Sequence, residues 1–432
     1  MNSWLLIGIA LSFLLALSVL AALGLRRGLL SAEASRKLVH LGMGLVCISF
    51  PFVFDSVIPV QVLAVVAVVS LLLLRLSPWK ASAGAALFSV ERVSVGELLF
   101  PVAVAWIFTL GFEKPLIYVI SLLLLSLADT AGAIAGSRFG KRLYQTRAGR
   151  KSVEGSCAFY VTALMCTAVP LLIWSDYDLL HIGLVALTVS LFTTAVEGAS
   201  GRGMDNLLIP IGSFLLLDYY LGLESFSLLW RLGILLGLLA LLLGTRRRHT
   251  FDGGALLCAL LFGFAAASMG GVFCLIATLV LFGRHLWAQC RMKSVERVQH
   301  SLDVIFFIAI PSLFWLTLSQ LGQLGRDSGE FGFIAVLSII IGMLHVGTQS
   351  HLGRGSSSWL KGLVLSALTM IPALFVEVPA IYCLAPLGIS LVTSFIYFRW
   401  RRGPDEVVFY QWAKLGVLAS VASVLLLLIL PL

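Results

Sequence analysis

Long apolar runs follow one another along most of the chain, separated by short polar or basic stretches. Many of these runs contain about 17–25 residues, which as a helix is long enough to cross a hydrocarbon core about 30 Å thick. We count about fifteen or sixteen such segments, several of them short. The pattern therefore predicts an all-α, polytopic integral membrane protein with about 15–16 transmembrane helices.

The composition supports this class. Of the 432 residues, 59% are hydrophobic and 12% are charged, whereas water-soluble domains contain about 25% charged residues. The first apolar run, roughly 4–25, has no positive charge before it and is followed by Arg26 and Arg27. We therefore expect a retained helix and not a cleaved secretory signal.

The net charge of +9 is informative because of where the cations lie. If the N-terminus is outside, one zigzag path puts every basic stretch on the cytoplasmic side, as the positive-inside rule requires. These stretches are 26–37, 75–92, 138–151, 246–249, 284–297, 354–361 and 399–402. The charge therefore indicates membrane topology and phosphate binding, and it gives no reason to expect nucleic acid as a partner.

A basic tract at 245–249 divides the chain into two halves. We predict a catalytic membrane domain over residues 1–244 and a second helical membrane domain over 245–432.

The densest group of polar residues lies at 127–156. Asp129 stands near the end of an apolar run, with Gly132 and Gly136 on the same helical face. An acidic residue inside a membrane segment is costly and usually functional, although the glycines alone would be explained by close helix packing. A basic loop follows and ends at Lys151, Ser152, Glu154 and Gly155; it is not a Walker A sequence.

Three further groups carry candidate chemistry. Arg36, Lys37 and His40 open the second apolar segment, where they could bind phosphate or merely anchor the membrane edge. Glu97 starts another apolar run, where a carboxylate also suits the helix dipole. Glu197, Asp205 and Asn206 lie in a Gly/Ser-rich loop, where an Asp–Asn pair is also ordinary helix capping.

The predicted topology brings these groups to one rim of the membrane. Mg²⁺ prefers a few carboxylates together with phosphate oxygens and water, and several cations on the same rim suit a polyphosphate. The sequence therefore predicts a magnesium–nucleotide site whose metal ligands are Asp129, Glu154, Glu197 and Asp205.

Five ordered motifs also carry a family resemblance. They are RKLVH at 36–40, GELLFP at 96–101, ADTAGAIAGSRFGK at 128–141, KSVEGS at 151–156 and EGASGRGMDNLLIP at 197–210. Over about residues 30–220 the chain resembles the CTP-dependent polyprenol kinases, which include phytol kinases, dolichol kinases and fungal-type diacylglycerol kinase. The resemblance implies Mg²⁺-dependent transfer of phosphate from CTP, or another nucleoside triphosphate, to a lipid alcohol.

The resemblance and the charge pattern together give the expected site. The catalytic residues are Asp129, Glu154, Asp205 and His40, with Asp205, Glu197 and His40 as alternative bases. The residues expected to contact nucleotide or phosphate are Arg36, Lys37, Arg138, Lys141, Lys151, Ser152, Gly155 and Asn206. Glu97 is a further candidate.

The second half weakly resembles the membrane family that contains plant phytyl-phosphate kinase. Where that family is expected to carry two acids, this chain reads VGTQSHLG at 346–353. The missing acids favour a degenerate, structural or lipid-holding half.

Two other classes stay open. A cytidylyltransferase that makes a CDP-lipid would use the same nucleotide and metal. A transporter would suit the many helices but would place its acids near the middle of the membrane. An oligomer is compatible with all three.

Overall fold

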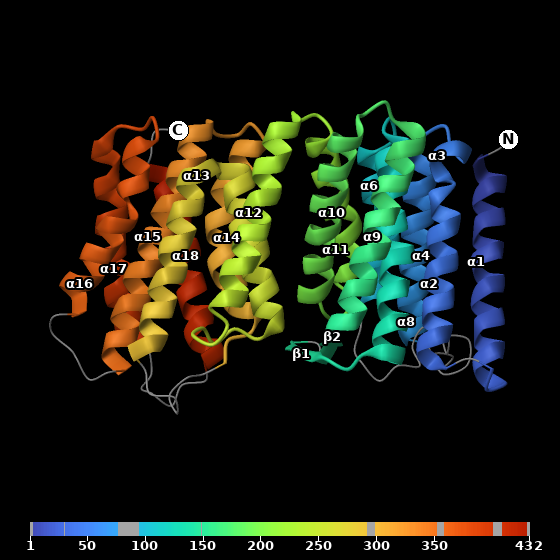
Figure 1. The fold of residues 1–432 in the computed structure, drawn as a ribbon, viewed down its shortest axis with the longest axis horizontal. Helices are drawn as coiled ribbons and strands as arrows, with labels where there is room; N and C mark the ends of the chain where they lie inside the picture. Colours follow the sequence, from blue (N-terminus) through green and yellow to red (C-terminus); the bar gives the residue numbers. More distant parts are fainter. Residues whose placement is uncertain are drawn as a thin grey trace. The chain divides into compact units, whose positions relative to one another are not determined.

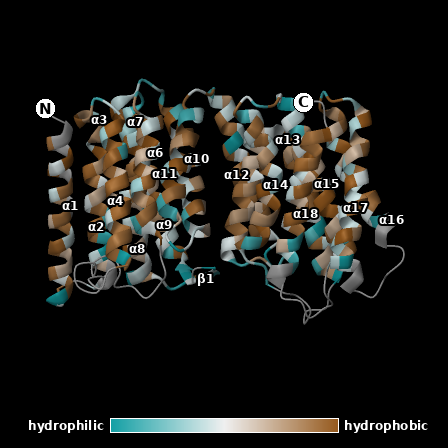
Figure 2. Cartoon of the chain, turned by 180° about the vertical axis from the view of Figure 1, so that it is seen from behind, coloured by the Kyte–Doolittle hydropathy of each residue, from teal (hydrophilic) through white to brown (hydrophobic). Residues whose placement is uncertain are grey.

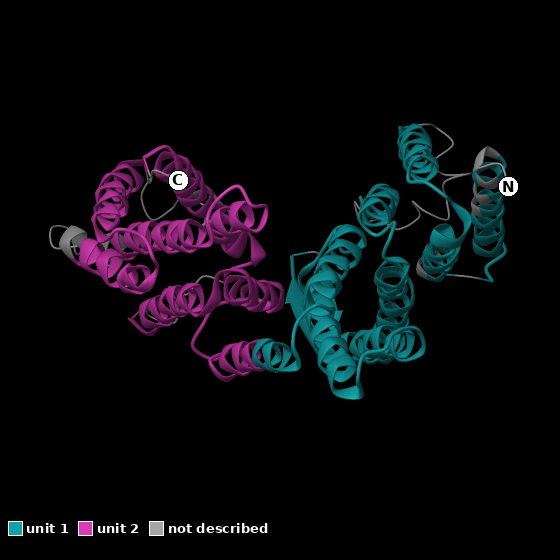
Figure 3. Ribbon diagram, turned by 90° about the horizontal axis from the view of Figure 1, so that it is seen from above, with its two compact units in different colours: residues 1–232 teal, residues 233–432 magenta. Residues whose placement is uncertain are grey.

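The computed structural model describes residues 3–29, 31–76, 95–147, 149–291, 299–351, 358–400 and 408–429. The chain divides into two compact units, Met1–Leu232 (unit 1) and Gly233–Leu432 (unit 2), which Figure 3 shows in different colours. The division falls within helix α12 (Ser225–Gly244), slightly before the boundary expected at residue 244. Parts of six predicted basic stretches, and the end of the octet at 346–353, lie outside the described residues.

Apart from connecting loops, one small hairpin and an isolated bridge between Phe251 and His300, the described part of the chain is helical, and twelve of its helices are long and apolar enough to cross a membrane. Figure 2 shows hydrophobic residues covering most of each helix. The all-α polytopic class is therefore confirmed. Helix α13 (Gly253–Arg291) would span about 58 Å if straight, but it breaks at Gly271, whose φ is 70°. The shorter helices of the described chain include α6 (Gly96–Leu110), α11 (Asp205–Tyr220) and α16 (Ser358–Thr369). The described residues thus give twelve candidate spans where about 15–16 were expected.

Unit 1 is a helical bundle (Figure 1), and its most buried spans are Pro115–Phe139 and Leu179–Ala199. Its remaining elements are α1 (Ser3–Arg26), α2 (Ala32–Ile48), α3 (Phe50–Val53), α4 (Ile58–Leu76), α7 (Pro115–Leu123), the π-helical turn η2 (Leu124–Ala128), α8 (Asp129–Phe139), β1 (Leu143–Thr146), β2 (Gly149–Ser152), α9 (Val153–Trp174) and α10 (Leu179–Ala199). The α7–η2–α8 segment is apolar on all sides before Asp129, and a helix of that kind belongs in the interior.

Close packing explains the small residues after Asp129. A Cβ atom added to Gly155 would lie 2.9 Å from the carbonyl oxygen of Gly132 and 3.1 Å from the Cα of Gly136. Helices α8 and α9 therefore approach at a distance that only glycine allows here. Gly132 and Gly136 therefore serve close helix packing in this structure.

The basic loop after α8 contains a hairpin that the sequence analysis did not anticipate. Strands β1 and β2 pair antiparallel, with Tyr144 opposite Lys151 and Thr146 opposite Gly149. The signal for it was a short β-prone run, Leu143–Thr146, followed by a glycine-containing turn. The hairpin places Lys151 so that its side chain reaches Glu197 at the end of α10.

Unit 2 is built around one buried helix, α15 (Arg326–His351). The others are α14 (Leu302–Gln320), η4 (Ile371–Phe375), η5 (Ala380–Cys383), α17 (Leu384–Trp400) and α18 (Val408–Ile429). Helix α15 packs against α13, α14, α16, α17 and α18. Its apolar, small-residue surface is buried on every side, as expected for the central helix of a bundle.

Candidate functional site

A buried ion pair joins the start of α8 to α2. The ammonium of Lys37 lies 2.5 Å from the Asp129 carboxylate, and each side chain is only 9% exposed. The π-helical turn directly precedes Asp129, and such turns occur frequently at functional sites. The sequence analysis included both residues but did not foresee their pairing or the turn, for which the sequence has no recognisable signal.

His40 lies one turn after Lys37 on α2 and faces the same acid. Its Nε2 is 3.3 Å from the carbonyl oxygen of Leu125, within the π-helical turn, and 3.6 Å from the Asp129 carboxylate. Its ring meets the Phe100 ring edge to face, with centroids 5.2 Å apart. His40 therefore connects Asp129 to helix α6.

A second ion pair joins the hairpin to the end of α10. The Lys151 ammonium lies 2.7 Å from the Glu197 carboxylate and also donates to the Glu197 carbonyl oxygen. Burial alone would lower the pKa of Lys151, but the negative charges of Glu197 and Asp205 outweigh it and raise that pKa. Lys151 is therefore a cation at any physiological pH.

Tyr144, opposite Lys151 on the hairpin, is a site residue that the sequence analysis missed. Its hydroxyl lies 2.8 Å from the Ser156 hydroxyl. Burial and the nearby Glu197 charge raise the pKa of the phenol, so it remains a neutral hydrogen-bonding group beside the second ion pair.

Asp205 brings the two ion pairs into one site. It opens α11, and its charge interacts with His40, Lys151 and Glu197. Glu197 also interacts with Asp129. We call Lys37, His40, Asp129, Lys151, Glu197 and Asp205 the ionic cluster; it draws on α2, α8, β2, α10 and α11.

Asn206 and Gly96 hold α6 against this cluster. The Asn206 side-chain amide donates to the Gly96 carbonyl oxygen at 2.8 Å, and a Cβ atom on Gly96 would lie 2.7 Å from that amide nitrogen. The next residue, Glu97, lies 3.4 Å from Arg75 of α4. The amide of Asn206, expected at the nucleotide, thus binds the backbone at the start of α6, next to Glu97.

Glu154 takes a different position from the other predicted acids. Its carboxylate accepts hydrogen bonds from the backbone N–H groups of Lys141 at 3.0 Å and Arg142 at 3.2 Å. Glu154 thus binds the backbone at Lys141 and Arg142, just before strand β1.

The other predicted phosphate ligands lie around the hairpin or at the start of α2. The Ser152 hydroxyl accepts from the Gly155 N–H and caps α9. The side chains of Arg138 and Lys141 are exposed, and Arg36 is half-buried. Arg36 interacts electrostatically with Asp129, a member of the ionic cluster.

The donor set of the ionic cluster suits a hard cation, since Asp129, Glu197 and Asp205 offer carboxylate oxygens. Lysines hold two of these carboxylates, and within the described ranges no three His, Cys, Asp or Glu side chains are grouped as metal ligands. Magnesium binding would therefore require the lysines to exchange partners, and the site remains a prediction.

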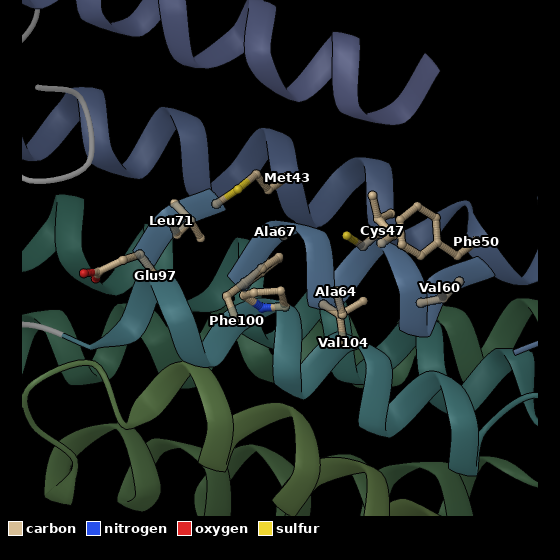
Figure 4. A pocket seen from close by; sticks show the side chains of 12 residues that line it. Met43, Cys47, Phe50, Val60, Ala64, Ala67, Leu71, Glu97, Phe100 and Val104 are labelled. Atoms are coloured by element: carbon tan, nitrogen blue, oxygen red, sulfur yellow. The ribbon is translucent and has the colours of Figure 1, made fainter. Parts of the chain in front are cut away.

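An apolar groove lies beside the ionic cluster between α2, α4 and α6 (Figure 4). It contains about 580 Å³ of space, part of it open at the surface. Its lining residues are Met43, Cys47, Phe50, Val60, Leu63, Ala64, Ala67, Leu71, Glu97, Phe100, Pro101 and Val104. Glu97 lies at one end, and Phe50 and Val60 lie at the other.

Comparison with known proteins places the chain in a family. No family model matches it, and no solved structure matches it. A curated phytol kinase from Synechocystis sp. is 31% identical over 217 residues, which cover 49% of this chain and 90% of the relative. Because the match spans nearly the whole length of that relative, the chain belongs to the phytol and polyprenol kinase family.

Proposed function

We propose that the protein is a lipid kinase that transfers the γ-phosphate of CTP, or another nucleoside triphosphate, to the hydroxyl of an isoprenoid alcohol. Phytol, farnesol, geranylgeraniol and polyprenols are the candidate acceptors. The relative's name supports the reaction class. The observation that carries the proposal is the ionic cluster, which gathers acids and lysines from five elements beside an apolar groove.

The two lysines are suited to bind the phosphates. Phosphoryl transfer depends mainly on positioning and on neutralising charge. In this structure Lys37 and Lys151 are held by carboxylates, so an incoming polyphosphate competes for both ammonium groups. Once the lysines turn to phosphate, Asp129, Glu197 and Asp205 become available as metal ligands.

Mg²⁺ bound there would neutralise phosphate charge as the bond to the leaving nucleotide breaks. The chain's own residues orient the acceptor. His40, held between Leu125 and Asp129, can take the hydroxyl proton, and Asp205 and Glu197 are alternative bases. Loose transition states make modest demands on that base.

We place the site on the cytoplasmic side. The hairpin that carries Lys151 lies at the same end of unit 1 as the C-terminal end of α1, which ends at Arg26 and is followed by Arg27. Basic residues gathered at one end of a membrane bundle indicate the cytoplasmic face, and nucleotides are supplied from that side.

The decisive experiment is phosphate transfer by purified protein reconstituted in lipid. γ-Labelled CTP, ATP, GTP and UTP would be supplied with Mg²⁺ and each candidate alcohol or diacylglycerol. We expect label in an isoprenoid alcohol, and loss of that label in Lys151→Met. In a parallel reaction with α-labelled CTP and a phospholipid acid, label entering the lipid with release of pyrophosphate would instead identify a cytidylyltransferase. Absence of nucleotide binding would favour a transporter.

A further inference from the structure

We propose that the groove between α2, α4 and α6 holds the hydrocarbon chain of the acceptor, with its hydroxyl at the Glu97 end. This inference rests on the proposed function, because it assigns the binding site of the lipid substrate. It commits to one occupant, a single isoprenoid chain lying roughly parallel to the helices.

The lining suits such a chain. Eleven of the twelve lining residues are apolar and the twelfth is Glu97. Along α4 the groove extends from Val60 to Leu71, which at 1.5 Å per residue is about 16 Å. That length is about half of a hydrocarbon core roughly 30 Å thick. The chain of an alcohol whose hydroxyl lies at headgroup level would therefore fit along it.

The polar end of the groove leads to the ionic cluster. Phe100 forms part of the groove wall and packs its ring edge to face with His40. Gly96, adjacent to Glu97, is bonded by Asn206, which follows Asp205. The Glu97 end of the groove therefore contacts the ionic cluster through His40 and through the neighbour of Asp205. A hydroxyl bound at this end would lie beside the proposed phosphate site.

Glu97 has the chemistry to hold that hydroxyl. Its side chain is 12% exposed, and its contact with Arg75 is a long one at 3.4 Å. A buried carboxylate retains several acceptor sites when one is used. It can therefore accept the hydrogen bond of the alcohol while it keeps its contact with Arg75. Glu97 is a positioning residue in this assignment.

Two alanines on α4 leave the space open. Ala64 and Ala67 lie three residues apart, hence on the same face of the helix. Val65, adjacent to Ala64, is 63% exposed and faces away. Larger side chains would fill the groove at Ala64 or Ala67 but leave it intact at Val65.

The test compares Ala64→Phe and Ala67→Phe with the control Val65→Phe. A blocked pocket discriminates by about tenfold or more, so we expect KM for phytol or geranylgeraniol to rise at least about tenfold in both alanine variants. The shorter alcohol geraniol should be less affected, and KM for the nucleotide should not change. Equal KM values for the long alcohols in wild type and both alanine variants would overturn the assignment.

Photo-crosslinking of the wild-type protein covers the case in which the alanine variants do not fold. An isoprenoid alcohol with a diazirine near its tail should label peptides of α2, α4 and α6 that line the groove, and phytol should compete. Label confined to other helices would overturn the assignment. Binding is read without phosphate transfer, so a wild-type protein that labels the groove but phosphorylates no alcohol would refute only the proposed function.

Discussion

The two units hold their buried cations in different ways. In unit 1 a buried cation, Lys37, lies against Asp129, and a half-buried one, Lys151, lies against Glu197. In unit 2 the guanidinium of Arg284 on α13 is also buried, yet among the described residues it has no carboxylate partner.

Neutral groups hold Arg284 instead. One terminal nitrogen, Nη2, donates to the Leu344 carbonyl oxygen and to the Thr348 hydroxyl, each at 2.7 Å. Its Nε, and both ring nitrogens of the buried His345, have no hydrogen-bond partner within the described part of the chain.

This difference distinguishes a site in unit 1 whose ion pairs can exchange partners from a structural arrangement in unit 2. A buried pair is neutral overall, and an anion or a metal ion can replace either partner. Removing one partner leaves a buried charge uncompensated, which is strongly destabilising. A cation that already has no carboxylate loses no such partner when it is replaced. Unit 1 should therefore be sensitive, and unit 2 tolerant, to changes at their buried cations.

The largest effect is expected for Asp129→Asn. The substitution keeps the shape but leaves Lys37 buried without its counter-charge, so the free energy of unfolding should fall by about 3–5 kcal/mol. Phosphate transfer should fall by about 100-fold or more, as for loss of a preorganised electrostatic group. Thermal unfolding in detergent and the label-transfer assay measure the two effects.

The double variant Lys37→Met/Asp129→Leu is the matched control. It removes both charges, and replacing a whole buried pair by apolar side chains is often neutral or stabilising. We expect stability to return while activity stays low. A double variant as unstable as Asp129→Asn would contradict the importance of the pairing.

The fold was largely predictable from the sequence. Apolar run length reports membrane crossing directly, which is why the all-α polytopic class could be predicted. The hairpin was missed because its two four-residue strands are too short for a period-two pattern to stand out from a basic loop. The π-helical turn was missed because its residues read as ordinary helix.

The sequence indicated candidate residues for the site, but it did not indicate which of them contact one another. An acid within an apolar run, such as Asp129, indicates function because of its cost in a membrane. Which cation meets it depends on the register between α2 and α8, and that register follows from packing around Gly44 and Ser126, which are in close contact. Glu154 carries the same charge, but its neighbours in space are backbone N–H groups.

Acid should weaken unit 2 through His300. Its Nδ1 lies 2.6 Å from the Thr250 hydroxyl, its ring packs against Trp412, and burial lowers its pKa from 6.5 to about 4. The fold favours the neutral ring, so the stabilisation is full above pH 6.5 and is lost as pH falls from 6.5 to 4. The loss is about 3 kcal/mol. Hydrogen exchange of α13 and α14 against pH measures it, and His300→Gln should reduce the dependence.

Alkali should weaken unit 1 by a smaller amount through Lys151. Its pKa lies above the ordinary value of 10.5 because Glu197 and Asp205 outweigh the effect of burial. The fold favours the charged form, so this stabilisation is full below pH 10.5 and is lost as pH rises through the higher folded-state pKa. Hydrogen exchange of β2 and α10 should report the loss. If Lys151→Met showed the same alkaline slope, another group would be responsible.

The smallest effect is expected for Arg284→Met, compared with Lys37→Met in unit 1. The Thr348 hydroxyl also donates to the Leu344 carbonyl at 2.8 Å, so both groups that bind Arg284 keep a partner after the substitution. We expect the free energy of unfolding to change by no more than about 1 kcal/mol, or to rise, whereas Lys37→Met should lower it by about 3–5 kcal/mol. Both would be measured by thermal unfolding under identical conditions. Equal destabilisation by the two variants would show that Arg284 is compensated as fully as Lys37, and the contrast between the units would be wrong.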